Sequence, residues 1–325
     1  MTTATLHVGC DENGLGPRLG PMIVTAVMAE AAPGASRIAT SRARGKLAQI
    51  LGDSKGLVAH GDVALGQAWA RALAKRGATR LERASDVAPG SVEELVDALC
   101  LDDRAVLTAP CPSHVAPQCW GTRAETFDDS DAAHMLEGEV VRSLDKLEAR
   151  GVRIVRVRSV VVCTKLLNDA ALAGNSRFKV DLHAMERLVL DLRGAAGADV
   201  HAVCGKVGGY GNYSDAFGPL SGRLHAVVEE SRAKSTYRFP GVGELSFVRD
   251  ADRDHLLVSM ASLVGKWLRE VLMSRIVAHY RATEDGVPVA SGYHDPVTTR
   301  FVALTARARH DQRIPAECFE RTKSA

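Results

Sequence analysis

Two adjacent carboxylates, Asp11 and Glu12, lie in a glycine-rich stretch between two apolar runs, within residues 8–27. A carboxylate pair at the end of a strand offers hard oxygen ligands to a divalent cation. Flexible glycine backbone beside the pair can bring main-chain N–H groups close to a phosphate. The same residue types also occur in plain polar turns. The stretch is therefore a candidate active site, with a polar turn as the alternative.

A second acidic group, Asp250, Asp252 and Asp254, comes directly before a long helical pattern over residues 255–280. A helix N-terminus attracts phosphate oxygens through its free N–H groups and its dipole, although aspartates are also ordinary helix caps. Small residues occupy the first turns of the pattern. Because small side chains allow close approach, we expect this helix to pack tightly on a sheet.

Alternating strand and helix patterns surround these groups and indicate an α/β fold. The glycine-rich stretch joins the first two predicted strands, which leaves Asp11 and Glu12 at a strand end. Strands are predicted over residues 5–11, 21–29, 152–162, 199–204 and 244–248, and helices over residues 41–51, 66–76, 91–100, 132–151 and 255–280.

The composition excludes several classes of protein. With 325 residues, 46% of them hydrophobic, the chain can bury a substantial core without disulfide or metal staples. No apolar run reaches membrane-spanning length, and the first residues lack a basic leader, so we expect no membrane anchor. Seven cysteines, an odd number, are not typical of a disulfide framework and favour a reducing compartment. We therefore expect a cytoplasmic protein.

The net charge of +2 does not by itself indicate a nucleic-acid-binding protein. The distribution of charge is more informative. Arg153, Arg156 and Arg158 follow one another along a predicted strand, as phosphate contacts would require, or as part of a solvated surface. Residues 84–134 combine four prolines with many acidic side chains, which indicates an insertion or lid that could contact a partner protein.

Four residues in and near this acidic segment raise the question of a zinc site. Cys100, Cys111, His114 and Cys119 include zinc-binding residue types, but their spacing is irregular for such a site. Ordinary loop and core cysteines are the alternative interpretation.

Four segments together resemble the signature segments of type 2 ribonuclease H, including its archaeal and eukaryotic branch. They occur in the same order and with similar internal spacing, and they cover the chain in outline from residue 6 to about 303, with residues 84–134 outside the resemblance. The segments are GCDENGLGPRLGPMIVTAV (9–27), DSKGL (53–57), DADRDHLLVSMASLVGKW (250–267) and SGYHDPVTT (291–299).

The resemblance implies a ribonuclease H-like mixed sheet flanked by helices, with acidic residues at its centre that bind two divalent metals. It implies a catalytic domain over residues 1–275, which contains the insertion at 84–134, and a C-terminal helical extension over residues 276–325. Two cations can activate a water, orient a phosphate and stabilise the leaving oxygen. Hard oxygen ligands suit Mg²⁺ or Mn²⁺.

The same resemblance assigns the acidic residues. Asp11 and Glu12 match the first acidic pair of the family, and Asp252 matches its final acidic position. These three are the predicted catalytic residues and metal ligands. Asp250 and Asp254 flank the last position and are weaker candidates.

The third acidic position of the family departs from the pattern. Alignment of residues 201–213 places Gly205 where an aspartate ends a strand. Because glycine has no side-chain ligand, one of the two metal sites should be weakened. Three interpretations compete: an inactive variant, a homologue that only binds nucleic acid, and a site repaired by another carboxylate, for which Asp181 and Glu186 are conceivable. Cys204 is adjacent, but a thiol is a poor ligand for magnesium.

Substrate contacts are also implied by the resemblance. In the family, the backbone of the corresponding glycine loop contacts the 2′-hydroxyl that distinguishes RNA from DNA. Here Gly14, Leu15 and Gly16 keep that backbone, while Leu15 replaces an arginine found in many members. Arg18 is a candidate to supply the lost phosphate contact.

Three more residues complete the predicted substrate site. Lys55 and Lys266 align with positions near the substrate backbone and can act as phosphate-binding point charges. Tyr293 matches the tyrosine that stacks beneath the sugar at an RNA to DNA junction; a packed ring is the plain alternative. Ser262 is expected to have a supporting role.

The predicted function is endonucleolytic hydrolysis of the RNA strand of RNA–DNA hybrids by two metals, impaired by the loss of the aspartate at position 205. The alternative is a degenerate protein that binds nucleic acid without turnover. The expected partners are an RNA–DNA hybrid or duplex DNA that contains ribonucleotides. A structure-specific DNA nuclease with the same superfold is an outside possibility.

Overall fold

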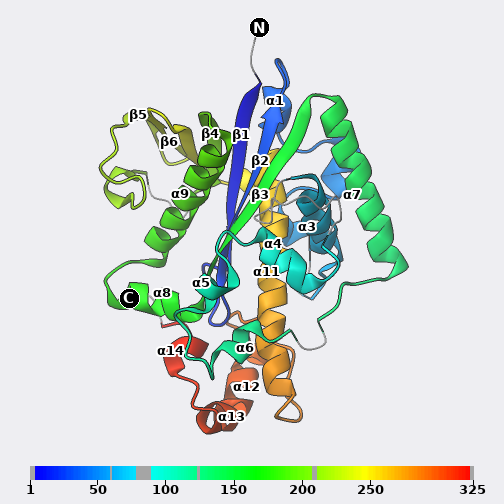
Figure 1. Cartoon of the computed structure of the whole chain (residues 1–325), viewed down its shortest axis with the longest axis vertical. Helices are drawn as coiled ribbons and strands as arrows, with labels where there is room; N and C mark the ends of the chain where they lie inside the picture. The colour runs from blue at the N-terminus through cyan, green and yellow to red at the C-terminus, as the bar shows by residue number, and fades with distance from the viewer. Residues whose placement is uncertain (1–3, 59–60, 78–88, 123–124, 207–210, 323–325) are drawn as a thin grey trace.

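The computed structural model describes residues 4–58, 61–77, 89–122, 125–206 and 211–322. In these ranges the chain forms one seven-stranded mixed sheet with helices on both faces (Figure 1). This architecture confirms the predicted α/β class with a mixed sheet flanked by helices.

The sheet places the ends of three parallel strands side by side. The strand order is β3-β2-β1-β4-β7-β6-β5, with β1, β4 and β7 parallel and the other neighbours antiparallel. Because parallel strands share a direction, β1, β4 and β7 end at the same edge of the sheet. The strands are β1 (Thr5–Asn13), β2 (Met22–Ala31), β3 (Val152–Val162), β4 (Val200–Gly205), β5 (Ala226–Glu230), β6 (Lys234–Phe239) and β7 (Gly243–Val248).

Long helices cover the two faces of the sheet. The helix α11 (Leu256–Arg281) crosses one face of the sheet, and α3 (Ala64–Arg76) and α7 (Asp131–Ala149) contact β3 on the same face. The helix α9 (Arg177–Ala196) covers the other face (Figure 1). The shorter helices are α1 (Ser36–Ala39), the 3₁₀ helix η1 (Gly45–Gln49), α2 (Ser54–Leu57), α4 (Val92–Leu99), α5 (Arg104–Thr108), α6 (Ala116–Trp120), α8 (Thr164–Leu172), the 3₁₀ helix η2 (Ser214–Ala216), α10 (Ala251–Asp254), α12 (Pro296–Leu304), α13 (Ala306–Asp311) and α14 (Ala316–Phe319).

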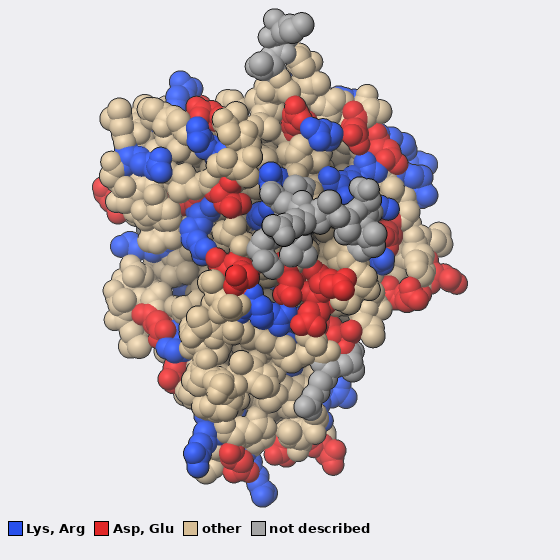
Figure 2. Space-filling model, in the orientation of Figure 1, with Lys and Arg blue, Asp and Glu red and all other residues tan. Residues whose placement is uncertain are grey.

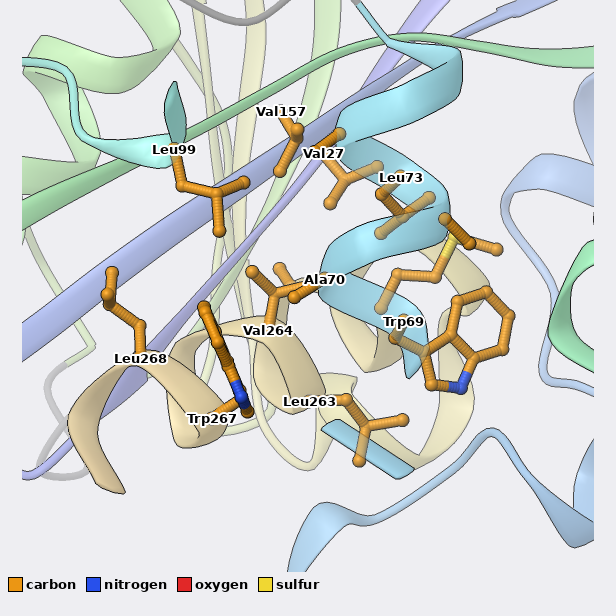
Figure 3. Close-up of a cluster of buried hydrophobic side chains, with 14 of the residues drawn as sticks. Val27, Trp69, Ala70, Leu73, Leu99, Val157, Leu263, Val264, Trp267 and Leu268 are labelled. Atoms are coloured by element: carbon orange, nitrogen blue, oxygen red, sulfur yellow. The ribbon is translucent and has the colours of Figure 1, made fainter. Parts of the chain in front are cut away.

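The core between the sheet and α11 is packed from aliphatic and indole side chains. Figure 3 shows Trp69 and Leu73 of α3, Trp267 of α11, and Val27 and Val157 of the sheet in one cluster of buried side chains. All five side chains are buried. Their burial fixes α11 against the centre of the sheet, since removing apolar surface from water is the main driving force of packing.

The close approach of α11 to β1 depends on glycine. A Cβ atom at Gly9 would lie 2.3 Å from the carbonyl carbon of Leu257, and a Cβ atom at Gly265 would lie 2.2 Å from Oδ1 of Asn13. Only glycine fits at both positions. The predicted tight packing of this helix on the sheet is confirmed.

The predicted helix over residues 41–51 is wrong. The structure has only the 3₁₀ helix η1 over Gly45–Gln49 in this stretch. Gly45 adopts a left-handed conformation with φ +58°, which an α-helix does not accommodate. The short 3₁₀ turn leaves the basic residues of the stretch on the surface.

The acidic segment over residues 84–134 is anchored in the core where the structure describes it. Residues 84–88 and 123–124 lie outside the described ranges. The helix α4 begins at a cap in which Ser91 accepts a hydrogen bond from the N–H of Glu94, and it buries Leu95 and Leu99. The N–H of Leu101 donates to the carbonyl of Ser159 on β3 over 2.7 Å. Figure 2 shows acidic side chains gathered over this region of the surface.

The C-terminal helices form a small core of their own around the end of α11. Tyr280 packs edge-on against Phe301 and Phe319. The boundary proposed after residue 275 falls inside α11, so the two predicted regions share one continuous helix. Among the described residues, no helix has both the length and the apolar character needed to cross a membrane.

Candidate active site

Asp11 and Gly205 lie next to each other at the edge where β1 and β4 end. The two strands pair in register at Cys10 and Cys204, one residue before each. A Cβ atom built on Gly205 would lie 2.9 Å from Oδ1 of Asp11. A side chain at position 205 would therefore point directly at the first predicted metal ligand.

Asp252 reaches the same edge from the short helix α10. Asp250 precedes that helix with a left-handed backbone, φ 55°, which turns the chain from β7 into α10. The hydroxyl of Ser259 donates to the carbonyl of Asp252 over 2.6 Å and ties α10 to the first turns of α11. Asp254 instead forms an ion pair with Arg253 at 2.9 Å.

One cavity of 570 Å³ collects most of the predicted site residues. We call it the carboxylate pocket. Its lining residues are Asp11, Glu12, Asn13, Gly14, Leu15, Gly16, Ser54, Gly205, Lys206, Arg249, Asp250, Ala251, Asp252, Ser262, Lys266, Arg269, Glu270 and Tyr293. The described residues of the 84–134 segment do not line it.

Carboxylates crowd one another in this pocket. Burial raises the pKa of Asp11 well above its usual range, and the charges of Glu12 and Asp252 raise it further, while a hydrogen bond with Ser262 acts in the opposite direction. Each cause except the last penalises the ionised carboxylate. A bound cation would relieve the repulsion among the three carboxylates.

The donor chemistry of the pocket fits hard divalent cations, although no closed coordination shell is formed. Among the described residues, no group of three or more His, Cys, Asp or Glu side chains stands in the arrangement of a metal site. The carboxylates of Glu12 and Asp252 nevertheless lie near that of Asp11, and carboxylate oxygens are the ligands that Mg²⁺ and Mn²⁺ prefer.

Two arginines donate hydrogen bonds to the backbone of the glycine loop, residues 14–16. Nη1 of Arg321 donates to the carbonyl of Gly14 over 2.5 Å, and Nη1 of Arg177 donates to the carbonyl of Leu15 over 3.2 Å. The carboxylate of Glu12 accepts from the N–H of Leu15 over 3.2 Å. Gly16 is exposed, with no atom within 4 Å of a hypothetical Cβ. The loop is therefore fixed at one end and open to a ligand at the other.

Gly14 is required for the packing of a buried arginine. It has φ +95°, and a Cβ atom there would lie 2.7 Å from Nε of Arg269. Arg269 is only 2% exposed, and its guanidinium lies 4.7 Å from the centre of the Tyr293 ring. Tyr293 itself is 47% exposed. The arginine thus supports one face of the tyrosine ring and leaves the ring available to a ligand.

Lys266 connects α11 to the DSKGL segment. Its ammonium donates to the carbonyls of Ser54, over 3.1 Å, and Val58. These contacts hold the segment against α11 and place the positive charge of Lys266 in the lining of the carboxylate pocket. Lys55 belongs to α2 in the same segment.

Arg18 is engaged away from the pocket. Its Nε donates to the Glu320 carboxylate over 2.6 Å. Two arginines of the predicted basic run on β3 also form ion pairs within the protein. Arg153 pairs with Glu30, and Nε of the buried Arg158 lies 3.8 Å from Oδ2 of Asp191.

Two residues, Asp181 and Glu186, are the conceivable replacements for the missing aspartate. They differ in whether the carboxylate accepts hydrogen bonds. Glu186 is occupied, because its carboxylate accepts from the N–H groups of Gly218 and Leu220. Asp181 is fully buried on α9, and neither of its oxygens has a hydrogen-bond partner. Burial raises its pKa well above the usual range, and the charges of Glu12 and Asp11 add to the effect. Of the two, Asp181 is thus the buried carboxylate that interacts through its charge with Glu12 and Asp11.

The residues considered for zinc do not form one site: Cys111 and Cys119 lie near Cys163 and Cys318, but among the described residues no group of three or more His, Cys, Asp or Glu side chains is placed to hold a metal. Cys100 is buried beside β3, where it bridges to Ser159. His114 hydrogen bonds to the carbonyl of Arg313 over 3.1 Å. Cys111 lies beside Cys163.

Sequence reasoning missed the three arginines that shape the pocket. Arg269 lies one turn after Lys266 on α11, so helical spacing from a predicted site residue could have indicated it. Arg177 and Arg321 are brought to the glycine loop by tertiary contacts, and no local pattern marks them.

No protein-family model matches the chain, and no curated protein sequence matches it. Solved structures align with it at low similarity. A chain in the structure of the PCNA:RNase HII complex from Archaeoglobus fulgidus has 13% sequence identity and a TM-score of 0.41, over 98% of this chain and 95% of that chain. Bst-RNase HIII in complex with Mn²⁺ has 12% identity and a TM-score of 0.46, over 98% of this chain and 66% of that chain. Ribonuclease H2 from Pyrococcus horikoshii OT3 has 11% identity and a TM-score of 0.37, over 97% and 92%.

Proposed function

We propose that the protein is a ribonuclease H-type endonuclease that hydrolyses the RNA strand of RNA–DNA hybrids, with activity reduced by the glycine at position 205. One observation carries the proposal: residues 11, 12, 252 and 293, which belong to three of the four sequence segments, line one pocket together with residue 205, which the alignment of residues 201–213 indicates. Chance similarity between short segments would not require that convergence.

In this proposal Asp11, Glu12 and Asp252 hold the divalent cations. When bound, the cations activate a water, orient the scissile phosphate and stabilise the leaving oxygen. The protein contributes fixed positions for the carboxylates, because β1, α10 and α11 are locked together by close packing and by the bond from Ser259 to Asp252.

Substrate recognition is assigned to the two sides of the pocket. The open end of the glycine loop, at Gly16, presents backbone that can approach a ribose 2′-hydroxyl. Tyr293, supported by Arg269, offers a ring face to a sugar or base. Lys266 contributes positive charge near the backbone. An RNA–DNA hybrid, or duplex DNA that contains ribonucleotides, is the substrate class that uses all three features.

We further propose that Asp181 supplies the fourth carboxylate charge of the site, in place of the side chain missing at Gly205. A buried carboxylate without any hydrogen-bond partner is costly. Asp181 is close enough to interact through its charge with Glu12 and Asp11, so a cation bound by those two carboxylates would also be attracted by Asp181. Groups behind metal ligands typically contribute about 10- to 100-fold to affinity or activity, so a partial repair is expected.

The alternative is a nucleic-acid-binding protein without turnover. Gly205 specifically favours it, since the position beside Asp11 has no ligand. A cleavage assay separates the two functions: the purified protein is incubated in Mg²⁺ and then Mn²⁺ with a labelled RNA–DNA hybrid, an all-DNA duplex and a single-ribonucleotide duplex. We expect cleavage of the hybrid, with 3′-hydroxyl and 5′-phosphate ends. Binding without cleavage would support the alternative, and cleavage of all-DNA duplex would indicate a DNA nuclease.

A further inference from the structure

A second pocket, of 540 Å³, lies beside the first residue of α11 and is lined from α1, η1 and the C-terminal end of α7. Six of its lining residues are cationic, and none of the described lining residues is acidic. We call this site the basic pocket; its cationic residues are Arg37, Arg42, Arg44, Lys46, Lys146 and Arg150.

The positive charge of the basic pocket is not neutralised by the described part of the chain. All six side chains are exposed. The acids nearest to them in sequence on α7, Asp145 and Glu148, pair with Arg76 of α3 instead. Asp254 interacts with Arg42 through its charge but pairs directly with Arg253. Six like charges around one hollow repel one another, and an anionic ligand would remove that repulsion.

The shape and chemistry of the basic pocket match a chain of phosphates better than a single small anion. Its cations come from three separate elements and therefore surround the hollow, while Ile38, Leu47, Leu147 and Leu256 provide apolar surface between them. Arginine binds phosphate in a bidentate manner and lysine as a point charge. A nucleic-acid backbone presents several phosphates in a row with sugar between them, which suits such a surface.

The basic pocket adjoins the carboxylate pocket through α10. The N–H of Leu256 donates to the carbonyl of Ser41 over 3.0 Å, which fixes the wall of the basic pocket to the start of α11. Asp252, which lines the carboxylate pocket, is four residues earlier. Four residues span at most about 14 Å, so these two lining residues lie within about four nucleotide steps of one strand.

We propose that the basic pocket binds backbone phosphates of the duplex substrate within about four nucleotide steps of the bond that is cut. The inference rests on the proposed function for the position of the cut. The contact is made with phosphates, so it does not distinguish a hybrid from duplex DNA. It contributes affinity and orientation, while the choice of the RNA strand belongs to the carboxylate pocket.

The test measures binding of a 5′-fluorescent RNA–DNA hybrid and of an all-DNA duplex by anisotropy, in EDTA to prevent cleavage, over a series of salt concentrations. The variant Arg44→Gln/Lys146→Gln removes two charges from opposite walls of the basic pocket. The matched control, Arg223→Gln/Arg281→Gln, removes two exposed charges that do not line it. Thermal melting of each variant verifies folding.

We expect the pocket variant to bind both duplexes at least ~10-fold more weakly at low salt, and the slope of log Kd against log salt to fall by about two. The control should change affinity less than about twofold. Neutral methylphosphonate linkages within about four steps of the cut should weaken binding to the unmodified protein but not to the variant.

Two results would overturn the inference, and they are distinguishable. If the unmodified protein binds duplexes and the pocket variant binds them equally well with the same salt slope, the basic pocket serves another anionic partner and the proposed function is unaffected. If the unmodified protein neither binds nor cleaves a hybrid, both the proposed function and this inference fail.

Discussion

The carboxylate pocket and the basic pocket differ in both charge and burial. In the first, Asp11 lies among other carboxylates at a strand end, held by tight packing of β1 against α11. In the second, exposed cations surround a hollow without acidic lining among the described residues. Fixed, desolvated charges support chemistry, whereas exposed charges support binding that salt can screen. Substitutions should therefore have large, salt-independent effects in one pocket and small, salt-dependent effects in the other.

The largest effect is expected for Asp11→Asn. We predict a loss of hybrid cleavage on the order of a thousandfold, because the central cation ligand is removed. The metal-free protein should not lose stability, since its environment already disfavours the ionised form of Asp11. Cleavage rates and melting temperatures in EDTA measure both. Retained cleavage by this variant would place the chemistry elsewhere.

The next-largest effect is expected for the buried carboxylate of Asp181. Asp181→Asn should weaken Mn²⁺ binding and hybrid cleavage by about 10- to 100-fold, with Mn²⁺ affinity measured by isothermal titration calorimetry. Glu186→Gln is the matched control on the same helix, because Glu186 is engaged by the N–H groups of Gly218 and Leu220. If Asp181→Asn leaves Mn²⁺ affinity unchanged, Asp181 is only a buried acid of the core.

A smaller effect is expected at the rim of the carboxylate pocket. Tyr293→Ala should slow hybrid cleavage about tenfold, because stacking on an aromatic ring contributes about 1–3 kcal/mol per base. Tyr293→Phe keeps the ring on Arg269 and should stay close to the unmodified rate. Equal loss in both variants would indicate that the hydroxyl, rather than the ring face, matters.

The smallest effect is expected for a single cation of the basic pocket. Arg37→Gln should weaken duplex binding about threefold at low salt and not measurably at high salt, since one phosphate contact is lost. A loss that persists at high salt would show that this residue acts by geometry rather than by charge, and would remove the contrast between the two pockets.

Much of the fold follows from local patterns in the sequence. The strands β1, β2 and β3 and the helices α3, α7 and α11 coincide with predicted elements because their apolar residues recur at strand or helix spacing. The helix α9 was not predicted, although it has a serine cap, in which Ser176 accepts from the N–H of Lys179, and ends at Gly197. The strands β5 and β6 were also missed. Every residue of β5 is exposed, so it lacks the alternation that marks a strand.

From the sequence, only those residues of the candidate site that belong to a recognisable motif could be identified. The positions of Asp11, Gly205 and Asp252 were predicted, and the structure brings them together. Asp181, Arg177 and Arg321 could not be placed, because each reaches the site through the packing of a distant segment. The basic pocket was hidden for a related reason: its cations lie in three segments, one of which was predicted as a helix and is only a 3₁₀ turn.

The central claim is that the carboxylate pocket hydrolyses the RNA strand of a hybrid and lacks one carboxylate at residue 205. The most direct measurement is the cleavage rate of a labelled RNA–DNA hybrid in Mn²⁺ by the unmodified protein and by Gly205→Asp, side by side. Within 4 Å, a Cβ atom at position 205 would meet only Oδ1 of Asp11, so a small shift of that side chain would accommodate it. We predict slow cleavage by the unmodified protein and markedly faster cleavage by the variant. Absence of cleavage by both proteins, with hybrid binding intact, would contradict the claim.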